Sequence, residues 1–418
     1  MESFVRAQRD DPVPAAVHCC LLCQGARVRP LVEFGQQPPS NRFEFRASPE
    51  TERHPLTIAQ CDGCGLVQLV SPMSLDMVKA RFEWLVYNEP ESHLDALVGR
   101  ATRLPDVAPG KRVIGLTYKD DTTLARFDRM GYRNTYRFDP ALDLGVKDRC
   151  AGLETFQAVL AGAPVPALIA KHGRADLLVA RHILEHAHDP VSLLATMGKL
   201  TAPGGYLLLE VPDCTKFIGA CDYSFAWEEH ITYFSSETLA ALIDRAGLSL
   251  HDIYLHSYPY EDALIAIVRN DAPVRARRSE AQDIRDLLKA GADFAESYEN
   301  VKAKIQSRLR RWRQDGKRIA IFGAGHLAAK FINFYALGDL VECVIDDHEN
   351  KREMLMPGSR VPIHGAAALK DIDICLLSLN PESERKVVAK HQDFRDRSGQ
   401  FMSIFALNPN SVYRDGVK

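Results

Sequence analysis

The pattern of hydrophobic and polar positions predicts an α/β domain in the middle of the chain. Between residues 76 and 270, short apolar runs with the length of buried strands alternate with stretches at helical spacing. These runs are 112–116, 135–138, 175–180, 206–211 and 263–268. Strands that alternate with helices favour a mainly parallel sheet covered by helices, so we expect a Rossmann-like domain here.

The flanking segments have different patterns. Residues 276–315 are densely charged, contain no proline and carry apolar residues at helical spacing, which predicts one or two helices packed along one side. A second α/β unit is expected after them, with strands at 318–322, 341–345, 373–378 and 401–405. The first 75 residues offer only two short strand-like runs, at 57–60 and 65–70. We therefore predict three domains, with bounds 1–75, 76–275 and 276–418.

Composition narrows the class of protein. Of the 418 residues, 46% are apolar and 26% are charged, which is typical of a folded protein with sizeable cores. The formal net charge of -3 argues against a strongly basic nucleic-acid binder. The chain has no run of 18 apolar residues, and its start lacks the apolar core of a secretory signal. A cytoplasmic protein without membrane or nucleic-acid partners is expected.

Four of the ten cysteines form two CxxC pairs, Cys20-Leu-Leu-Cys23 and Cys61-Asp-Gly-Cys64. Each CxxC turn presents two sulfur atoms on one side, and tetrahedral zinc is commonly bound by four thiolates. Cys19 would compete with Cys20, but only Cys20 has the CxxC spacing. The pattern predicts one structural zinc ion, since four thiolates leave no position for a catalytic water. The alternative is four unligated thiols.

Candidate chemistry in the central segment lies where predicted strands end. Asp139 follows the second strand, where an acid of a Rossmann-like fold binds the ribose hydroxyls of a nucleoside cofactor. Histidines and acids crowd at 182–189, after the strand at 175–180. Glu229 and His230 precede a predicted helix that begins near Ser235. That histidine could act as a general base near pH 7, or the pair could cap or brace the helix.

The last segment carries a dinucleotide-like fingerprint. A strand leads into Gly323-Ala-Gly325-His-Leu-Ala-Ala329, and Asp346 and Asp347 follow the next strand. By itself this pattern favours NAD, because the glycines permit a tight turn and the helix start attracts phosphate. The glycines could also serve packing alone.

These motifs together resemble a family, the three-part bacterial C-methyltransferases that act on nucleotide-linked deoxysugars. The resemblance covers nearly the whole chain and keeps the order of its parts. It is carried by CLLC, FGQQPPSNRF, CDGCGLVQL, ILEHAHDP, APGGYLLLEVPD, EEHITYFSSETL, IFGAGHLAAKF, IDDHENKREMLMPGSRVPI and LLSLNPE. It implies a class I methyltransferase-like Rossmann domain between a small zinc-binding domain and a second Rossmann-like domain.

The resemblance also implies a reaction. A histidine base removes a proton beside a sugar ketone, and the enolate carbon takes a methyl group from S-adenosylmethionine. In this sequence the base would be His230, with Glu229, His186 and Tyr87 also in the catalytic site. Trp227 and Glu228 stand where the family has a tyrosine and a histidine.

The remaining roles follow from the same comparison with the family and from position. We expect cofactor contacts from Asp120, Asp139, Arg181 and His182, and substrate contacts from Gly323, Gly325, His326, Asp346 and Tyr233. The last domain would then help to hold the nucleotide diphosphate rather than NAD. Two other functions stay open: an isomerase, epimerase or lyase on the same scaffold, and a sugar-nucleotide-binding protein.

Overall fold

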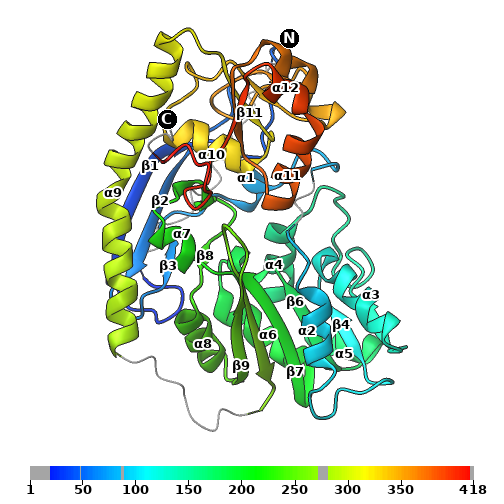
Figure 1. The fold of residues 1–418 in the computed structure, drawn as a ribbon. Coiled ribbons are helices and arrows are strands. Elements are labelled where there is room, and N and C mark those ends of the chain that lie inside the picture. The colour runs from blue at the N-terminus through cyan, green and yellow to red at the C-terminus, as the bar shows by residue number, and fades with distance from the viewer. Residues whose placement is uncertain (1–18, 48, 86–88, 272–280, 415–418) are drawn as a thin grey trace, which may run out of the picture.

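The computed structural model describes residues 19–47, 49–85, 89–271 and 281–414. Three sheets organise these residues, one of four strands, one of six and one of five (Figure 1). The class predicted from the sequence is confirmed: the fold is α/β, with a Rossmann-like central domain between two flanking units.

The amino-terminal sheet is antiparallel and draws its last strand from the central part of the chain. Its order is β1-β2-β3-β8, with bounds Val28–Gln37, His54–Cys61, Val67–Leu69 and Thr232–Tyr233. β3 pairs with β8 through Val67 opposite Tyr233. The short helix α1 (Leu75–Val78) follows, capped by the Ser74 side chain, which accepts the N–H of Met77. The two domains therefore share a sheet.

The central sheet has the order β5-β4-β6-β7-β10-β9. Its strands are β4 (Val113–Gly115), β5 (Thr135–Arg137), β6 (Ala175–Arg181), β7 (Thr201–Pro212), β9 (Ser249–His256) and β10 (Ala263–Arg269). β4, β5, β6 and β7 pair in parallel, whereas β10 runs antiparallel to both of its neighbours. All five predicted strands are present, and β9 is an additional edge strand.

Helices cover both faces of this sheet. They are α2 (Leu94–Ala101), α3 (Asp121–Arg129), α4 (Leu153–Ala161), α5 (Val165–His172), α6 (Pro190–Leu200) and α8 (Ser236–Arg245), whereas the short helix α7 (Thr215–Gly219) packs against the long helix that follows the central domain. Single 3-10 turns occur at Tyr118–Asp120, Leu184–His186 and Tyr223–Phe225. Within the described ranges no single helix could span a membrane; α4 and α5 meet the length and composition criteria only as a pair bent by 98°.

One continuous helix fulfils the prediction for the charged stretch. Helix α9 (Ala281–Gln314) has 34 residues, which corresponds to about 51 Å, and it runs along the whole side of the molecule in Figure 1. Its buried residues include Phe294, Tyr298 and Ile305. The Tyr298 hydroxyl donates to the carbonyl oxygen of Phe334 in the last domain at 2.9 Å, and the Tyr223 hydroxyl of the central domain donates to that of Phe294 at 2.6 Å.

The last domain has a parallel sheet with the order β13-β12-β11-β14-β15. The strands are β11 (Ile319–Phe322), β12 (Cys343–Ile345), β13 (Ile363–His364), β14 (Ile374–Leu377) and β15 (Gln400–Ser403). The helices are α10 (His326–Phe334), α11 (Pro381–Lys390) and α12 (Gln392–Asp396), with 3-10 turns at Glu349–Lys351 and Ala366–Asp371. The four predicted strands are confirmed.

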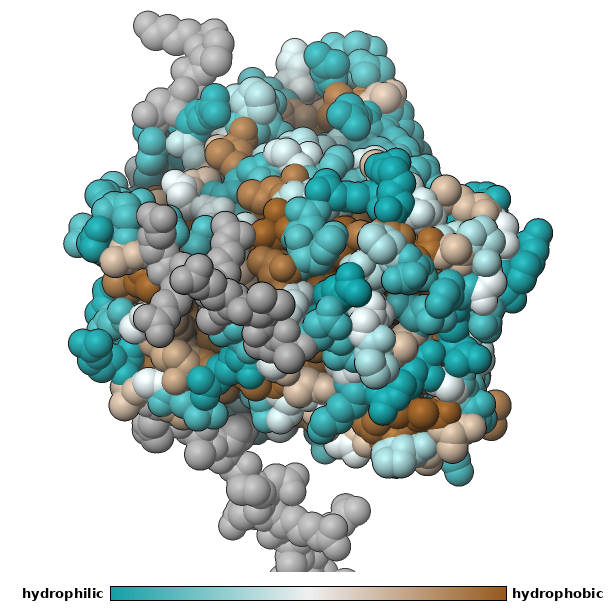
Figure 2. All heavy atoms as spheres, turned by 90° about the horizontal axis from the view of Figure 1, so that it is seen from below, coloured by the Kyte–Doolittle hydropathy of each residue, from teal (hydrophilic) through white to brown (hydrophobic). Residues whose placement is uncertain are grey.

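The domains share one hydrophobic core. Phe34 of β1 stacks on Phe334 of α10 with ring centroids 3.9 Å apart, and its edge meets Tyr298 of α9 at 5.3 Å. Outside this core the surface is mixed. Figure 2 shows a mostly hydrophilic face on which hydrophobic residues form small separate groups.

Candidate functional site

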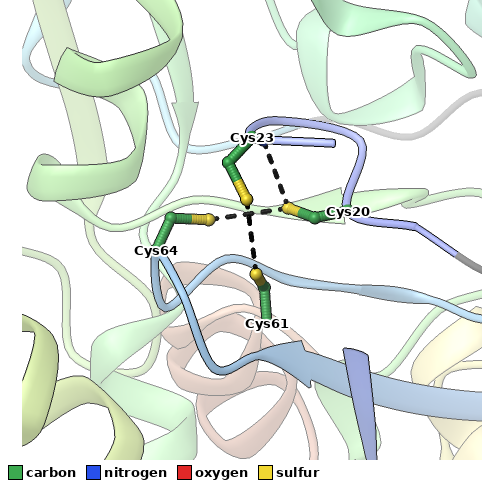
Figure 3. Close-up of side chains that lie close together, drawn as sticks. All are labelled: Cys20, Cys23, Cys61 and Cys64. Atoms are coloured by element: carbon green, nitrogen blue, oxygen red, sulfur yellow. Dashed lines mark hydrogen bonds between the residues drawn. The ribbon is translucent and has the colours of Figure 1, made fainter. Parts of the chain in front are cut away.

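The four cysteines of the CxxC pairs converge beside β1 and β2, with their sulfur atoms pointing toward one another (Figure 3). The Sγ atoms of Cys20 and Cys64 are 3.5 Å apart, as are those of Cys23 and Cys61. Four thiolates at the usual Zn–S distance of about 2.3 Å lie roughly 3.8 Å from one another, so this cluster fits a zinc ion.

Backbone groups around the cluster favour thiolates over thiols. The N–H groups of Leu22 and Cys23 donate to Cys20 Sγ at 3.4 Å, and that of Gly63 donates to Cys61 Sγ at 3.4 Å. The exposed Cys19 lies outside the cluster, as its spacing predicted. The site is built for a structural metal, because it presents four ligands and no open position.

A second candidate site is a cavity of about 410 Å³ at the junction of the three domains. It lies at the carboxyl ends of β6 and β7, the edge where doubly wound sheets bind ligands. The amino-terminal domain contributes Asn41 and the last domain contributes His326. The predicted site residues that line it are His182, His186, Glu229, His230 and His326.

The densest group of reactive side chains in this cavity is Glu185, His186 and His230. One oxygen or ring nitrogen from each lies within 4.8 Å of the other two. Oε1 of Glu185 lies 3.4 Å from Nδ1 of His182, whereas its Oε2 and Nδ1 of His186 are buried without a hydrogen-bond partner among the described residues. Such buried groups cost about 1–3 kcal/mol each when unsatisfied, so a bound ligand gains by meeting them. The donor types would also suit a transition metal.

Both histidines are neutral at pH 7. Burial lowers the pKa of His186 to about 4 and, with the positive charge of nearby groups, holds that of His230 well below its ordinary value. A neutral imidazole can accept a proton, and the carboxylate of Glu185 would then stabilise the imidazolium. The arrangement can therefore perform general-base chemistry on a ligand in the cavity.

The Glu229 side chain has a pKa far from that of an ordinary carboxylate. Burial and the carboxylates of Glu228 and Glu154 raise its pKa well above the usual range, which favours the protonated form of the carboxyl group. Its Oε1 lies 3.2 Å from Nδ2 of Asn41, which donates to it. A protonated carboxyl group in a cavity can donate a hydrogen bond to an oxygen that gains negative charge.

Neither Glu229 nor His230 caps the following helix. Ser235 caps α8, accepting the N–H of Thr238, and the Thr238 hydroxyl accepts the N–H of Ser235 in return. The bracing interpretation of the Glu229–His230 pair is therefore not needed to explain the start of α8.

The loop after β4 is held by Asp120. One of its carboxylate oxygens accepts the N–H groups of Leu116 and Thr117 at 2.8 and 2.9 Å, and the other accepts that of Arg181 at 2.9 Å. Burial raises the pKa of Asp120 to about 7. Asp120 does not line the cavity, but its neighbour Lys119 does, with its ammonium 2.5 Å from Glu89 Oε2.

Arg181 and His182 end β6 and differ in access to the cavity. Arg181 is sealed in the interior, where its Nε donates to Glu210 Oε2 at 2.7 Å. His182 lines the cavity. Although burial opposes its charge, the carboxylates of Glu89, Glu185 and Glu210 raise the pKa of His182 to about 10. Charged groups of both signs thus stand beside the loop where a nucleoside cofactor would lie.

Asp139 and Tyr233 take local roles in this structure. Asp139 follows β5 as predicted, and its Oδ1 accepts the N–H groups of Ala141 and Leu142 at 2.9 and 2.7 Å. The Tyr233 hydroxyl bonds with both the N–H and the carbonyl oxygen of Trp227. Neither residue lines the cavity. Tyr87 lies outside the described residues.

The residues of the dinucleotide-like fingerprint in the last domain contact one another and their own loops. A Cβ atom at Gly323 would lie 2.7 Å from Leu379 Cδ2, so the glycine permits close packing, and its φ is +104°. Asp346 Oδ2 accepts the N–H of Ala324 at 2.8 Å and pairs with Lys351 at 3.1 Å. The acid that would bind a dinucleotide ribose is thus engaged with its own loop, and Gly323, Gly325 and Asp346 lie outside the cavity lining.

Sequence reasoning did not assign roles to Glu185, Asn41 or Lys119. Glu185 belongs to the histidines and acids noted at 182–189 but received no role of its own, and Asn41 stands inside FGQQPPSNRF. Their importance depends on burial and on neighbours from other domains, which spacing along the chain does not reveal.

Three family models match consecutive parts of the chain. Residues 20–76 match a zinc binding domain, residues 99–253 a methyltransferase domain, and residues 271–405 a C-methyltransferase C-terminal domain. The C-methyltransferase NovU of Streptomyces niveus is 24% identical over 400 residues, which cover 92% of this chain and 94% of NovU.

Solved structures are similar to less than half of the chain. Magnesium protoporphyrin IX methyltransferase from Synechocystis PCC 6803, with bound S-adenosylhomocysteine, is 14% identical; the match covers 44% of this chain and 90% of that one, with a TM-score of 0.31. A Burkholderia thailandensis 1,6-didemethyltoxoflavin-N1-methyltransferase is 15% identical; the match covers 43% and 76%, with a TM-score of 0.29.

Proposed function

Since the chain belongs to the C-methyltransferases that combine a zinc-binding domain, a methyltransferase domain and a characteristic C-terminal domain, we propose that it methylates a carbon atom of a nucleotide-linked keto-deoxysugar. The methyl donor is S-adenosylmethionine. The observation that carries the proposal is the neutral His230 beside Glu185 Oε2 and His186 Nδ1, two atoms without a hydrogen-bond partner among the described residues, in a cavity enclosed by three domains.

The chemistry starts with a proton transfer. His230 accepts a proton from the carbon beside the sugar ketone, and the C–H electron pair becomes the enolate. Glu185 stabilises the resulting imidazolium, while Glu229, whose raised pKa favours the protonated form, donates a hydrogen bond to the enolate oxygen. S-adenosylmethionine, when bound, would supply the electrophilic methyl group for the enolate carbon and would leave as S-adenosylhomocysteine.

The cofactor is proposed to lie beside the loop after β4. Lys119 and the protonated His182 suit the carboxylate of an amino-acid end group, and Glu89 suits its ammonium. Asp139 follows β5 outside the cavity lining, and we propose that it binds the ribose with the carboxylate oxygen that does not accept the N–H groups of Ala141 and Leu142.

Hydroxyl groups of the sugar are proposed to bind the buried polar atoms of Glu185 and His186. His326 brings the last domain to the wall of the same cavity, which supports a role for that domain in holding the nucleotide part. Gly323, Gly325 and Asp346 would shape this wall from behind, and Tyr233 would brace the loop that carries His230.

A labelled-substrate experiment tests the proposal. The full-length protein is incubated in D2O with thymidine or uridine diphosphate 4-keto-6-deoxysugars and S-adenosylmethionine, and the sugars are analysed by mass spectrometry. We expect one added methyl group at the carbon beside the ketone. Deuterium uptake without methylation would instead indicate an isomerase, epimerase or lyase. If the protein binds the cofactor but none of these sugars gains a methyl group or deuterium, the proposed substrate class is contradicted.

A further inference from the structure

The loop 227–230, which carries Glu229 and His230, lies against helix α10 of the last domain. The His326 imidazole stacks on the Trp227 indole with ring centroids 4.2 Å apart and an interplanar angle of 15°. The Lys330 ammonium forms an ion pair with the Glu228 carboxylate. His326 and Lys330 are four residues apart, so they project from the same face of α10.

The ion pair is sealed from solvent. The side chain of Lys330 is 1% exposed and that of Glu228 is 0% exposed. Glu228 Oε1 also accepts the N–H of Ser40 at 2.5 Å and its hydroxyl at 2.8 Å. Burial alone would raise the pKa of Glu228, but the Lys330 charge lowers it below its ordinary value. A buried pair with its remaining acceptors satisfied has one geometry, because any displacement leaves a charge without a partner.

Trp227 is fixed from several sides as well. Its Nε1 donates to the Ser40 hydroxyl at 3.1 Å, and its ring lies 4.7 Å from that of His230. The Tyr233 hydroxyl accepts its N–H at 2.8 Å. Two consecutive residues are therefore anchored to neighbouring domains, while the next two face the cavity.

We propose that Lys330 and His326 are positioning residues that hold Glu228 and Trp227 and thereby set the place of His230. The two residues they hold are the two at which this chain differs from the tyrosine and histidine of the family it resembles. Helix α10, which a fingerprint in the sequence assigned to nucleotide binding, serves here as a clamp on the catalytic loop. The importance of the clamp for turnover rests on the proposed function, but the clamp itself does not.

Hydrogen–deuterium exchange of the free, zinc-loaded, full-length protein tests the clamp without any substrate. The reporters are the N–H of His230, which donates to the Trp227 carbonyl oxygen at 3.1 Å, and that of Ile231, which donates to that of Glu185 at 2.7 Å. Lys330→Met should raise exchange in a peptide spanning 227–231 about tenfold, because the loop then opens without global unfolding. His326→Ala should raise it less.

Arg360→Met is the matched control. Arg360 also joins the last domain to a glutamate of the amino-terminal domain, through an ion pair with Glu44, a residue outside the loop 227–230. Exchange at 227–231 should stay unchanged in this variant. Equal exchange in Lys330→Met and the unmodified protein, or an equal rise in Arg360→Met, would overturn the proposal.

A double variant covers the case in which Lys330→Met does not fold. Glu228→Met with Lys330→Met replaces the pair by apolar side chains, so folding should recover, while the Ser40 contacts to Glu228 stay lost. Raised exchange at 227–231 in this folded protein supports the clamp, and unchanged exchange refutes it. If the proposed sugar substrate is turned over, both variants should lower kcat at least tenfold with little change in KM. If hydrogen exchange at 227–231 changes as expected but no protein, modified or unmodified, turns over the sugar, the clamp is supported and only the proposed function is contradicted.

Discussion

The carboxylate of Asp120 accepts the backbone N–H of Arg181 at 2.9 Å, and so ties the loop after β4 to the end of β6. Its other oxygen accepts two N–H groups of its own loop. These three bonds give the loop a fixed shape although it contains no glycine after Gly115. Cofactor contacts are therefore left to neighbouring side chains.

Asp139 provides the first test of cofactor binding. Replacement by alanine should weaken S-adenosylhomocysteine binding by about 1.5–3 kcal/mol, because charge-assisted hydrogen bonds to the ribose are lost. Calorimetric titration measures this change. Asp139→Asn is the control, since it keeps the Oδ1 acceptor for Ala141 and Leu142. If both variants bind S-adenosylhomocysteine with unchanged affinity, Asp139 does not contact the cofactor and only stabilises its own turn.

The cysteine cluster predicts a metal stoichiometry. Protein purified without chelator should contain about one zinc per chain, and Cys61→Ser should reduce this nearly to zero because three ligands bind zinc far more weakly. Elemental analysis measures the content, with Cys19→Ser as the control.

The same variant should disturb the catalytic loop. Cys64 precedes β3, β3 pairs with β8, and β8 begins two residues after the loop 227–230.

A full equivalent of metal in Cys61→Ser would contradict the assignment of the four cysteines as zinc ligands. A second equivalent that depends on His230 would place a metal ion beside Glu185 and His186.

His230→Ala tests the base. Removing a general base should lower the rate of deuterium exchange beside the ketone by about 100- to 10,000-fold. Ligand binding and the urea midpoint of unfolding should change little, since the His230 side chain is only partly buried and faces the cavity. If deuterium exchange beside the ketone is as fast in His230→Ala as in the unmodified protein, His230 is not the base, and His186 becomes the candidate.

His182 predicts a pH dependence of stability. Its pKa is raised to about 10 in the folded protein, against about 6.5 when unfolded, so its proton stabilises the fold most below pH 6.5. Between pH 6.5 and 10 the contribution falls by up to about 1.4 kcal/mol per pH unit.

Urea unfolding of the unmodified protein and of His182→Asn measures this contribution. Asparagine tolerates the positive φ of 51° at this position. The difference in unfolding free energy between the two should shrink as pH rises to 10. A pH-independent difference for His182→Asn would refute the raised pKa.

The sequence predicted the elements whose pattern is local. Strands such as β6 and β14 are short apolar runs buried on both faces, and α9 shows uninterrupted helical spacing without proline. β9 escaped notice because it lies at the sheet edge and mixes His251, Asp252 and His256 with apolar residues. β8 has only two residues and exists because β3 of another domain pairs with it.

In the candidate sites, too, the features with a local sequence pattern were predictable and those that depend on the fold were not. The cysteine cluster was predictable because CxxC spacing fixes the geometry of each pair. The neutral state of His230 was not, since it depends on burial by three domains. The pairing of Glu228 with Lys330 joins residues 102 positions apart, which no single-sequence pattern reveals.

Helix α9 also constrains the order in which the protein can mature on the ribosome. The Phe34 ring packs between Tyr298 of α9 and Phe334 of α10, both of which are synthesised more than 250 residues later. The apolar face that carries Phe34 therefore remains uncovered until α9 has emerged. A nascent chain stalled before residue 281 should therefore be a chaperone client, and release of the completed helix should end that dependence.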